Sequence, residues 1–177
     1  MNDNKAPRTI TIYTDGSCID NGTATAEGGW AAVLDNGKKQ LRLSAGVSSD
    51  LFSAVTSSRM ELQAVIEGMK AVINKKAVIK VYTDSTYVKN SSTKWLQGWK
   101  RNGWKKSNGD PVQNKDLWIL LDGAMQELNV TFIKVKAHSG VAFNELADQL
   151  AYTAVGHDLK ITRHSSGAAQ LTTPISK

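Results

Sequence analysis

Two stretches of the sequence end alike, Ile10-Thr-Ile-Tyr-Thr-Asp-Gly-Ser17 and Ile79-Lys-Val-Tyr-Thr-Asp-Ser-Thr86. Each is rich in β-branched and aromatic residues, which predicts a β-strand that finishes on Tyr-Thr-Asp. If the two strands are parallel neighbours, the carboxylates of Asp15 and Asp84 emerge at the carboxyl end of one sheet, where open α/β sheets bind their ligands. The alternative is that each Asp only starts a turn or caps the helix that follows.

The remaining segments extend these two strands into a sheet covered by helices. Strands are predicted at residues 9–15, 28–34, 40–45, 77–84 and 130–136. Asn36-Gly37, between the second and third strands, is a strong hairpin signal. A Ser-rich loop at 46–58 precedes an amphipathic helix with an apolar face from Leu62 to Ile73, and further helices are expected at 115–128 and 144–155. The fold class is therefore α/β: a mixed five-stranded sheet, with an antiparallel meander of strands one to three, then strands four and five, and helices on both faces.

The composition is that of one globular domain. The chain has 177 residues, of which 41% are apolar and 21% are charged. Its single cysteine, Cys18, excludes a disulfide framework, and neither a membrane-spanning run nor a secretory signal is present. We therefore expect a cytoplasmic protein without a membrane partner, and a monomer. Residues 1–8 are expected to be a flexible N-terminus, 9–155 the folded domain, and 156–177 a disordered tail.

The positive charge is concentrated in residues 86–118. This stretch has seven basic residues against Asp110 and Asp116, and it accounts for +5 of the net charge of +6. It also contains four of the five tryptophans, Trp95, Trp99, Trp104 and Trp118. Basic residues interleaved with aromatic ones favour a surface for a polyanion such as nucleic acid. The alternative is a solvated helical face with buried tryptophans.

Two further acids and one histidine are candidates for the same end of the sheet. Glu61 lies at the start of the helix that follows the Ser-rich loop, and Asp148 lies one turn into the last helix. Each has a structural alternative, because Ser58-Arg-Met-Glu61 has the pattern of a capping box and a carboxylate near a helix N-terminus suits the helix dipole. His138 lies in a loop after the fifth strand, where a histidine is usually only solvated.

Four carboxylates at one edge of a sheet would repel one another unless some were protonated or a cation were bound. Oxygen ligands without thiolates select Mg²⁺ or Mn²⁺ over zinc. Two such ions can stabilise the attacking and leaving oxygens of a phosphoryl displacement. Together with the basic stretch, the acids therefore point to a nuclease.

The sequence resembles ribonuclease H of the bacterial type I class. The matching motifs occur in the family's order, from residue 9 to residue 155: Tyr13-Thr-Asp-Gly-Ser-Cys18 with Asn21, Ser58-Arg-Met-Glu-Leu62, Tyr82-Thr-Asp-Ser85, the stretch 95–118, Val135-Lys-Ala-His-Ser-Gly140 and Asn144-Glu-Leu-Ala-Asp148. The resemblance implies a ribonuclease H-like fold. It also implies an endoribonuclease that cuts the RNA strand of RNA–DNA hybrids by a two-metal-ion mechanism, leaving 5′-phosphate and 3′-hydroxyl ends.

The resemblance also assigns roles to individual residues. Asp15, Glu61, Asp84 and Asp148 match the metal-binding catalytic acids, and His138 matches a mobile-loop histidine that assists proton transfer or product release. Asn21, Thr56 and Asn144 match residues that contact the hybrid. Residues 95–118, called the handle below, match a basic helical protrusion that grips the DNA strand. Its candidate substrate contacts are Lys100, Arg101, Lys105, Lys106, Trp95, Trp99 and Trp104, although the spacing of the tryptophans favours packing of the handle over stacking on bases.

Some positions depart from the family pattern. Ser57-Ser58, Thr86 and Ala137 replace the usual residues, and the loop at 47–58 is longer than expected. These departures affect substrate contacts and loop mobility but leave the four acids intact. Two other functions stay open at this point: another nuclease on the same fold, such as a junction resolvase, and a non-catalytic module that binds hybrids.

Overall fold

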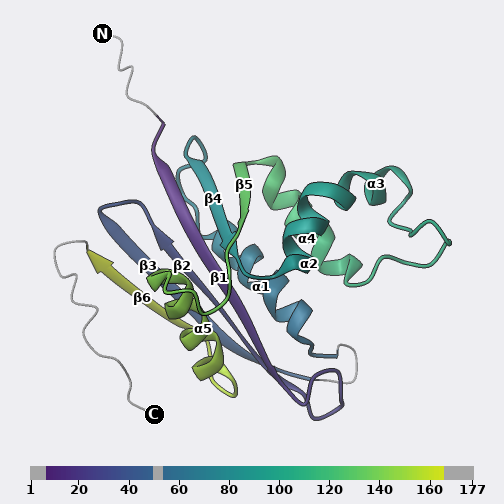
Figure 1. Ribbon diagram of the computed structural model, residues 1–177, viewed down its shortest axis with the longest axis horizontal. Helices are drawn as coiled ribbons and strands as arrows, with labels where there is room; N and C mark the ends of the chain where they lie inside the picture. The colour runs from purple at the N-terminus through teal and green to yellow at the C-terminus, as the bar shows by residue number, and fades with distance from the viewer. Residues whose placement is uncertain (1–6, 50–53, 166–177) are drawn as a thin grey trace, which may run out of the picture.

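The computed structural model describes residues 7–49 and 54–165, which form a six-stranded mixed sheet with helices on both faces (Figure 1). The strands lie in the order β5-β4-β1-β2-β3-β6. Their bounds are β1 Thr9–Ile19, β2 Glu27–Asp35, β3 Lys39–Ser48, β4 Val78–Thr83, β5 Asn129–Lys134 and β6 Lys160–Ser165. Strands β1, β2 and β3 form the predicted antiparallel meander, and β4 is parallel to both β1 and β5. The predicted fold class is therefore confirmed.

The sixth strand corrects the expectation that residues 156–177 are disordered. Residues 160–165 pair antiparallel with β3, and Ile161 lies opposite Leu43. Composition alone suggested disorder, but β3 would otherwise leave a row of unpaired backbone groups at the edge of the sheet, which β6 satisfies. Residues 166–177 lie outside the described part of the chain, as do residues 1–6 and positions 50–53 of the longer loop.

The three helices that the apolar periodicity predicts are present, and three shorter helical segments follow β4. Their bounds are α1 Ser57–Lys70, α2 Thr86–Asn90, the π-helical turn η1 Ser91–Trp95, α3 Leu96–Arg101, α4 Lys115–Gln126 and α5 Ala142–Ala154. Helix α1 covers one face of β1 and β2 and packs against α4, whereas α5 covers the opposite face of β1, β2 and β3. The apolar face of α1 buries Leu62, Ile66 and Met69 completely. Burial of each such side chain contributes about 1.5–3 kcal/mol.

Two glycines set how closely the helices approach the sheet. A Cβ atom on Gly16 would overlap the backbone of Met60 and Glu61 in α1, and one on Gly29 would overlap the Ala151 carbonyl in α5. Each glycine therefore lets a helix backbone lie directly on the sheet. Because Gly16 follows Asp15, this contact brings the first half of α1 next to the carboxyl end of β1.

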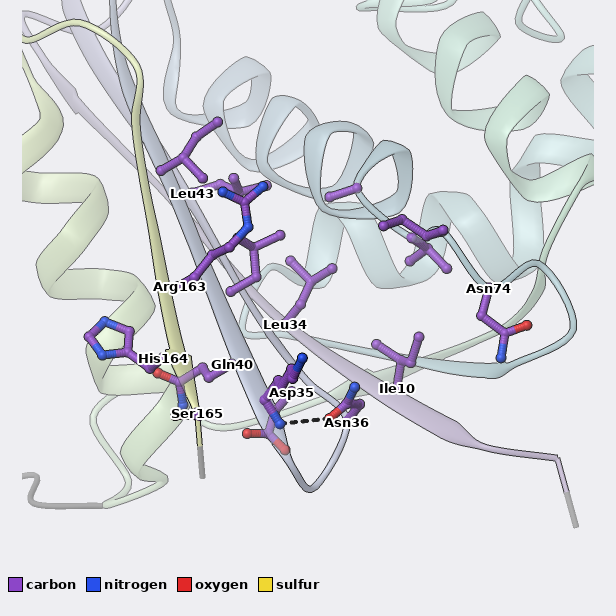
Figure 2. Close-up of a pocket in the computed structure, with 16 residues that line it drawn as sticks. Ile10, Leu34, Asp35, Asn36, Gln40, Leu43, Asn74, Arg163, His164 and Ser165 are labelled. Atoms are coloured by element: carbon purple, nitrogen blue, oxygen red, sulfur yellow. Dashed lines mark hydrogen bonds between the residues drawn. The ribbon is translucent and has the colours of Figure 1, made fainter. Parts of the chain in front are cut away.

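A groove lies at the other end of β1 (Figure 2). It has a volume of about 650 Å³, and it runs between the end of α1 and the strands β3 and β6. Its lining includes Ile10, Leu34, Leu43 and Arg163. Since Ile10 is at the amino end of β1, the groove is remote from Asp15. Among residues 7–49 and 54–165, no helix is both long and apolar enough to cross a membrane.

Candidate active site

The two repeated segments lie side by side, although β1 does not end at Asp15 as predicted but continues to Ile19, paired with β2. In the parallel pairing of β1 and β4, Tyr13 is opposite Tyr82 and Thr14 is opposite Thr83. The two tyrosine rings stack at 4.6 Å between centroids. Asp15 and Asp84 therefore emerge next to each other at the carboxyl end of the sheet, as the parallel arrangement predicts. The hydroxyl of Ser85, which accepts from the Val88 amide at 3.2 Å, caps α2, so Asp84 does not serve as its cap.

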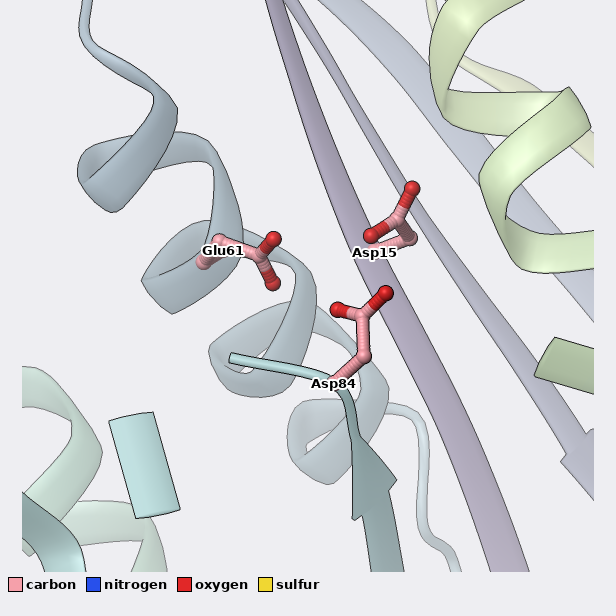
Figure 3. Close-up of side chains that lie close together, drawn as sticks. All are labelled: Asp15, Glu61 and Asp84. Atoms are coloured by element: carbon pink, nitrogen blue, oxygen red, sulfur yellow. The ribbon is translucent and has the colours of Figure 1, made fainter. Parts of the chain in front are cut away.

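Glu61 joins these two carboxylates from α1. The helix is capped by Thr56, whose hydroxyl accepts from the Arg59 amide at 3.2 Å. The interpretation of Ser58-Arg-Met-Glu61 as a capping box is therefore wrong, because Ser58 already lies inside the helix and Glu61 lies beyond its first turn. The close contact of α1 with Gly16 places the Glu61 carboxylate toward Asp15 and Asp84 (Figure 3).

These three acids form a compact cluster. One carboxylate oxygen from each of Asp15, Glu61 and Asp84 lies within 4.8 Å of the others. Asp15 is only 7% exposed, and the buried Oε2 atom of Glu61 has no hydrogen-bond partner among the described residues. An oxygen-only set with an unpaired buried oxygen is compatible with a hard divalent cation.

The electrostatics of the cluster favour a bound cation. Burial, reinforced by the charges of Asp84 and Asp148, raises the pKa of Asp15 to about 8. Burial and the neighbouring Asp15 and Asp84 likewise raise the pKa of Glu61 well above its ordinary value. Without a cation the cluster therefore holds protons near neutral pH, and a cation would replace them.

Asp148 and His138 lie beside this cluster. Asp148 is outside the set of three, but it is close enough to Asp15 to raise its pKa. The Nδ1 atom of His138 lies 3.6 Å from Oδ2 of Asp148. The His138 side chain is 78% exposed, and its backbone has a positive φ of 50°. The structure therefore brings all four predicted acids and the histidine to one edge of the sheet.

The three residues predicted to contact substrate occupy different environments. Asn21 is exposed, and its Oδ1 accepts from the Ser57 amide at 3.0 Å, which ties the loop after β1 to the start of α1. Thr56 is half-buried and serves as the cap of α1. Asn144 is only 3% exposed, and its Oδ1 is buried without a partner among the described residues. Their contacts with a substrate stay predictions.

The handle protrudes from one side of the sheet (Figure 1). Arg101, Lys105 and Lys106 are exposed, whereas Lys100 is half-buried and forms an ion pair with Asp122 at 2.9 Å. A backbone hydrogen bond from Trp104 to the Trp99 carbonyl, 2.7 Å long, holds the end of α3 to the next loop.

The tryptophans of the handle mainly pack. Trp118 is fully buried, and Trp99 meets it edge-on at 5.5 Å between ring centroids. Trp99 and Trp104 pack against the core, whereas Trp95 is 46% exposed. The preference for packing is confirmed for Trp99 and Trp104, and Trp95 keeps a surface for other contacts.

Sequence reasoning missed a network of polar contacts at the base of the handle. Arg59 forms a two-pronged ion pair with Asp116, at 2.6 and 3.0 Å, and Asn114 and Tyr87 lie in the same hydrogen-bond network. Arg59 stands two residues before Glu61, but a sequence pattern does not indicate which acid such an arginine will meet.

The fold and the site define an α/β nuclease, with clustered carboxylates at the carboxyl ends of parallel strands and a basic handle on the same domain. The RNase H family model matches residues 7–156. Ribonuclease H of Tolumonas auensis is 41% identical over 86% of this chain and 93% of that protein. Ribonuclease HI of Haemophilus influenzae is 43% identical over 82% of this chain and 88% of that protein. The chain therefore belongs to the ribonuclease H family, and it is an endoribonuclease that acts on RNA–DNA hybrids.

Solved structures agree with this assignment. LC9-RNase H1, a type 1 RNase H with the type 2 active-site motif, superposes with a TM-score of 0.73 at 27% identity, over 93% of this chain and 82% of that one. LC11-RNase H1 in complex with an RNA/DNA hybrid has a TM-score of 0.57 at 19% identity, over 82% of this chain and 96% of that one, which shows a common fold. Strand β6 lies beyond the residues that the family model matches.

Proposed function

We propose that the enzyme hydrolyses the RNA strand with two Mg²⁺ ions held by Asp15, Glu61, Asp84 and Asp148, and that it leaves 5′-phosphate and 3′-hydroxyl ends. The observation that carries this proposal is the cluster of three carboxylates within 4.8 Å, two of which have raised pKa values. Bound Mg²⁺ would supply charge stabilisation to the attacking and leaving oxygens. The oxygen-only ligands suit Mg²⁺, and Mn²⁺ would fit the same set.

The protein contributes position and proton transfer. Asp15, Glu61 and Asp84 come from two parallel strands and a helix that Gly16 holds against β1, so their relative positions are set by the core of the domain. The His138 imidazole is exposed next to Asp148, where it can accept or deliver a proton at the edge of the site.

Substrate choice depends on the two strands of the hybrid. The exposed Arg101, Lys105 and Lys106 provide positive charge for the phosphates of the DNA strand. Contacts to the 2′-hydroxyl groups are the physical means of selecting the RNA strand. Thr56 caps α1, the helix that carries Glu61, and Asn21 accepts a hydrogen bond from the Ser57 amide at the start of that helix, so these two residues are our candidates for such contacts.

A cleavage assay tests this function. An RNA–DNA hybrid, single-stranded RNA, duplex RNA and a four-way DNA junction are each incubated with Mg²⁺, with Mn²⁺ or with EDTA. We expect cleavage of the hybrid alone, only with metal, and 5′-phosphate ends on the RNA products. Cleavage of the junction would favour a resolvase, and binding of the hybrid without cleavage would favour a non-catalytic module.

We further infer that the enzyme acts as a cytoplasmic monomer on hybrids. The single cysteine and the handle, which lies on the same domain as the acids, support this inference. Light scattering of the pure protein and fractionation of its host cell test the two statements separately.

A further inference from the structure

Arg59 connects the helix that carries Glu61 to the base of the handle. Its guanidinium donates to both carboxylate oxygens of Asp116, at 2.6 and 3.0 Å, and to Oδ1 of Asn114 at 3.4 Å. The Arg59 side chain is only 20% exposed. A two-pronged pair of this kind fixes orientation as well as distance.

The connection continues into the handle. The side-chain amide of Asn114 donates to the Tyr87 hydroxyl at 3.2 Å, and the indole N–H of Trp118 donates to the same hydroxyl at 2.9 Å. Tyr87 lies on α2, three residues after Asp84, whereas Trp118 packs against Trp99 in the handle. One polar network therefore joins the elements that carry Glu61 and Asp84 to the base of the handle.

Arg59 also has a particular place in α1. It lies in the first turn, where its amide bonds to the Thr56 cap and the neighbouring Ser57 amide bonds to Asn21. These two contacts hold the start of α1 to its own loops. Among the described residues, Arg59 makes the side-chain ion pair that ties this first turn to the handle.

We propose that Arg59 is a positioning residue, which keeps the handle at a fixed position relative to the Glu61 carboxylate. This inference rests on the proposed function. A hybrid bound to the handle presents its RNA strand to the acids only if the two parts keep their relative placement. A misplacement of about 1 Å can cost roughly 100-fold in rate. Loss of the pair should therefore lower kcat on hybrids that reach the handle, with little change in KM.

The experiment compares hybrids of two lengths. A long hybrid is shortened until the triple variant Arg101→Gln, Lys105→Gln, Lys106→Gln has the same KM as the wild type. That length defines a short hybrid that does not touch the handle. Steady-state kcat and KM are then measured on both hybrids, well below the melting temperature of each variant.

The variants separate geometry from charge. Arg59→Ala and Asp116→Ala each remove one partner, and the double variant keeps the net charge of the protein. Arg59→Lys keeps the positive charge but loses the two-pronged geometry. The matched control is Lys75→Ala, because Lys75 follows α1 and pairs at 3.1 Å with Glu127 at the end of α4, so this ion pair joins the C-terminal ends of the two helices whose N-terminal turns Arg59 and Asp116 connect.

We expect Arg59→Ala, Asp116→Ala and the double variant to lose roughly 10- to 100-fold in kcat on the long hybrid, and to match the wild type on the short one. Arg59→Lys should lose activity in the same length-dependent way, whereas Lys75→Ala should match the wild type on both hybrids. Equal losses on both lengths, full activity of Arg59→Lys, or no length at which the triple variant differs from the wild type would each overturn the role of Arg59. A wild type that cuts neither hybrid would instead remove the proposed function, and this inference with it.

Discussion

Glu61 is the residue whose environment is hardest to explain without a cation. It is held by a helix that presses on Gly16, its Oε2 is buried without a partner among the described residues, and burial and two neighbouring acids raise its pKa. Because Thr56 caps the N-terminus of α1, the Glu61 side chain is not needed as a capping group. Its position therefore serves the acidic cluster.

Neutral amides should separate activity from stability in this cluster. Asp15→Asn, Glu61→Gln and Asp84→Asn each keep the shape of the side chain and lose the charge that binds metal. We expect no measurable turnover and a metal-free protein at least as stable as the wild type, because charge repulsion is relieved. His138→Ala should lose only about 10²–10⁴-fold in rate. Activity assays and urea unfolding check both parts, and an active Glu61→Gln enzyme would return this residue to a structural role.

The stability of the metal-free protein should depend on the protonation of Asp15. Burial and the neighbouring acids raise its pKa from an ordinary 3.8 to about 8 in the folded state, so the folded protein binds this proton more tightly than the unfolded chain. The resulting stabilisation is complete below about pH 4 and is lost as the pH rises to about 8. Urea unfolding in EDTA, compared between wild type and Asp15→Asn across this range, measures the contribution of Asp15. A constant difference between the two proteins would contradict the raised pKa.

At the scale of elements, the contact between α1 and β1 places one acid against another. Gly16→Ala would push the added methyl group into the backbone of Met60 and Glu61. We expect a loss of about 1–3 kcal/mol in the free energy of unfolding, as for other overpacked sites, together with loss of activity. Gly98→Ala, where a Cβ atom meets nothing within 4 Å, is the control, and it should be neutral or stabilising by up to about 1 kcal/mol in helix α3.

Strand β6 should contribute to stability without taking part in catalysis. Deletion of residues 159–177 removes the pairing with β3 and uncovers Leu43, which lines the groove at the end remote from Asp15. We expect the free energy of unfolding to fall by about 1–3 kcal/mol, with kcat on a hybrid unchanged at a temperature where the protein stays folded. A large fall in kcat for the folded, shortened chain would mean that β6 affects the acidic site.

At the scale of the whole molecule, charge is divided between an acidic cluster at the end of the sheet and a basic handle. Four basic residues of the handle are predicted from the sequence to contact phosphates. One of them, Lys100, is half-buried and forms an ion pair with Asp122. The other three candidates, Arg101, Lys105 and Lys106, are exposed, and the contacts of all four with a hybrid stay predictions. The handle is thus expected to supply affinity, while the acids supply the chemistry.

Salt dependence measures the contribution of the handle. Each phosphate contact adds about 0.9 to the slope of log affinity against log salt concentration on B-DNA. The triple variant Arg101→Gln, Lys105→Gln, Lys106→Gln should bind hybrid more weakly at low salt, with a flatter slope. Its KM should rise while kcat stays near that of the wild type. Binding is measured with Ca²⁺ in place of Mg²⁺, and an unchanged slope would make the handle merely a solvated face.

The features of this protein that depend on short segments could be predicted from the amino-acid sequence. The strand segments that carry Asp15 and precede Asp84, the hairpin at Asn36-Gly37 and the basic stretch are each visible in a few neighbouring residues, because alternation, turn residues and charge are local properties. The order of the motifs was enough to indicate the family.

Contacts between residues that are far apart in the chain became visible only once the segments were packed together. In the folded protein Gly16 admits Glu61 to the cluster, Arg59 pairs with Asp116 and β6 extends the sheet. Each of these contacts joins segments whose separation along the chain carries no sign of their proximity. They form because helices and strands pack in the one arrangement that buries their apolar faces and pairs their backbone groups, which is a property of the whole chain and of no single segment.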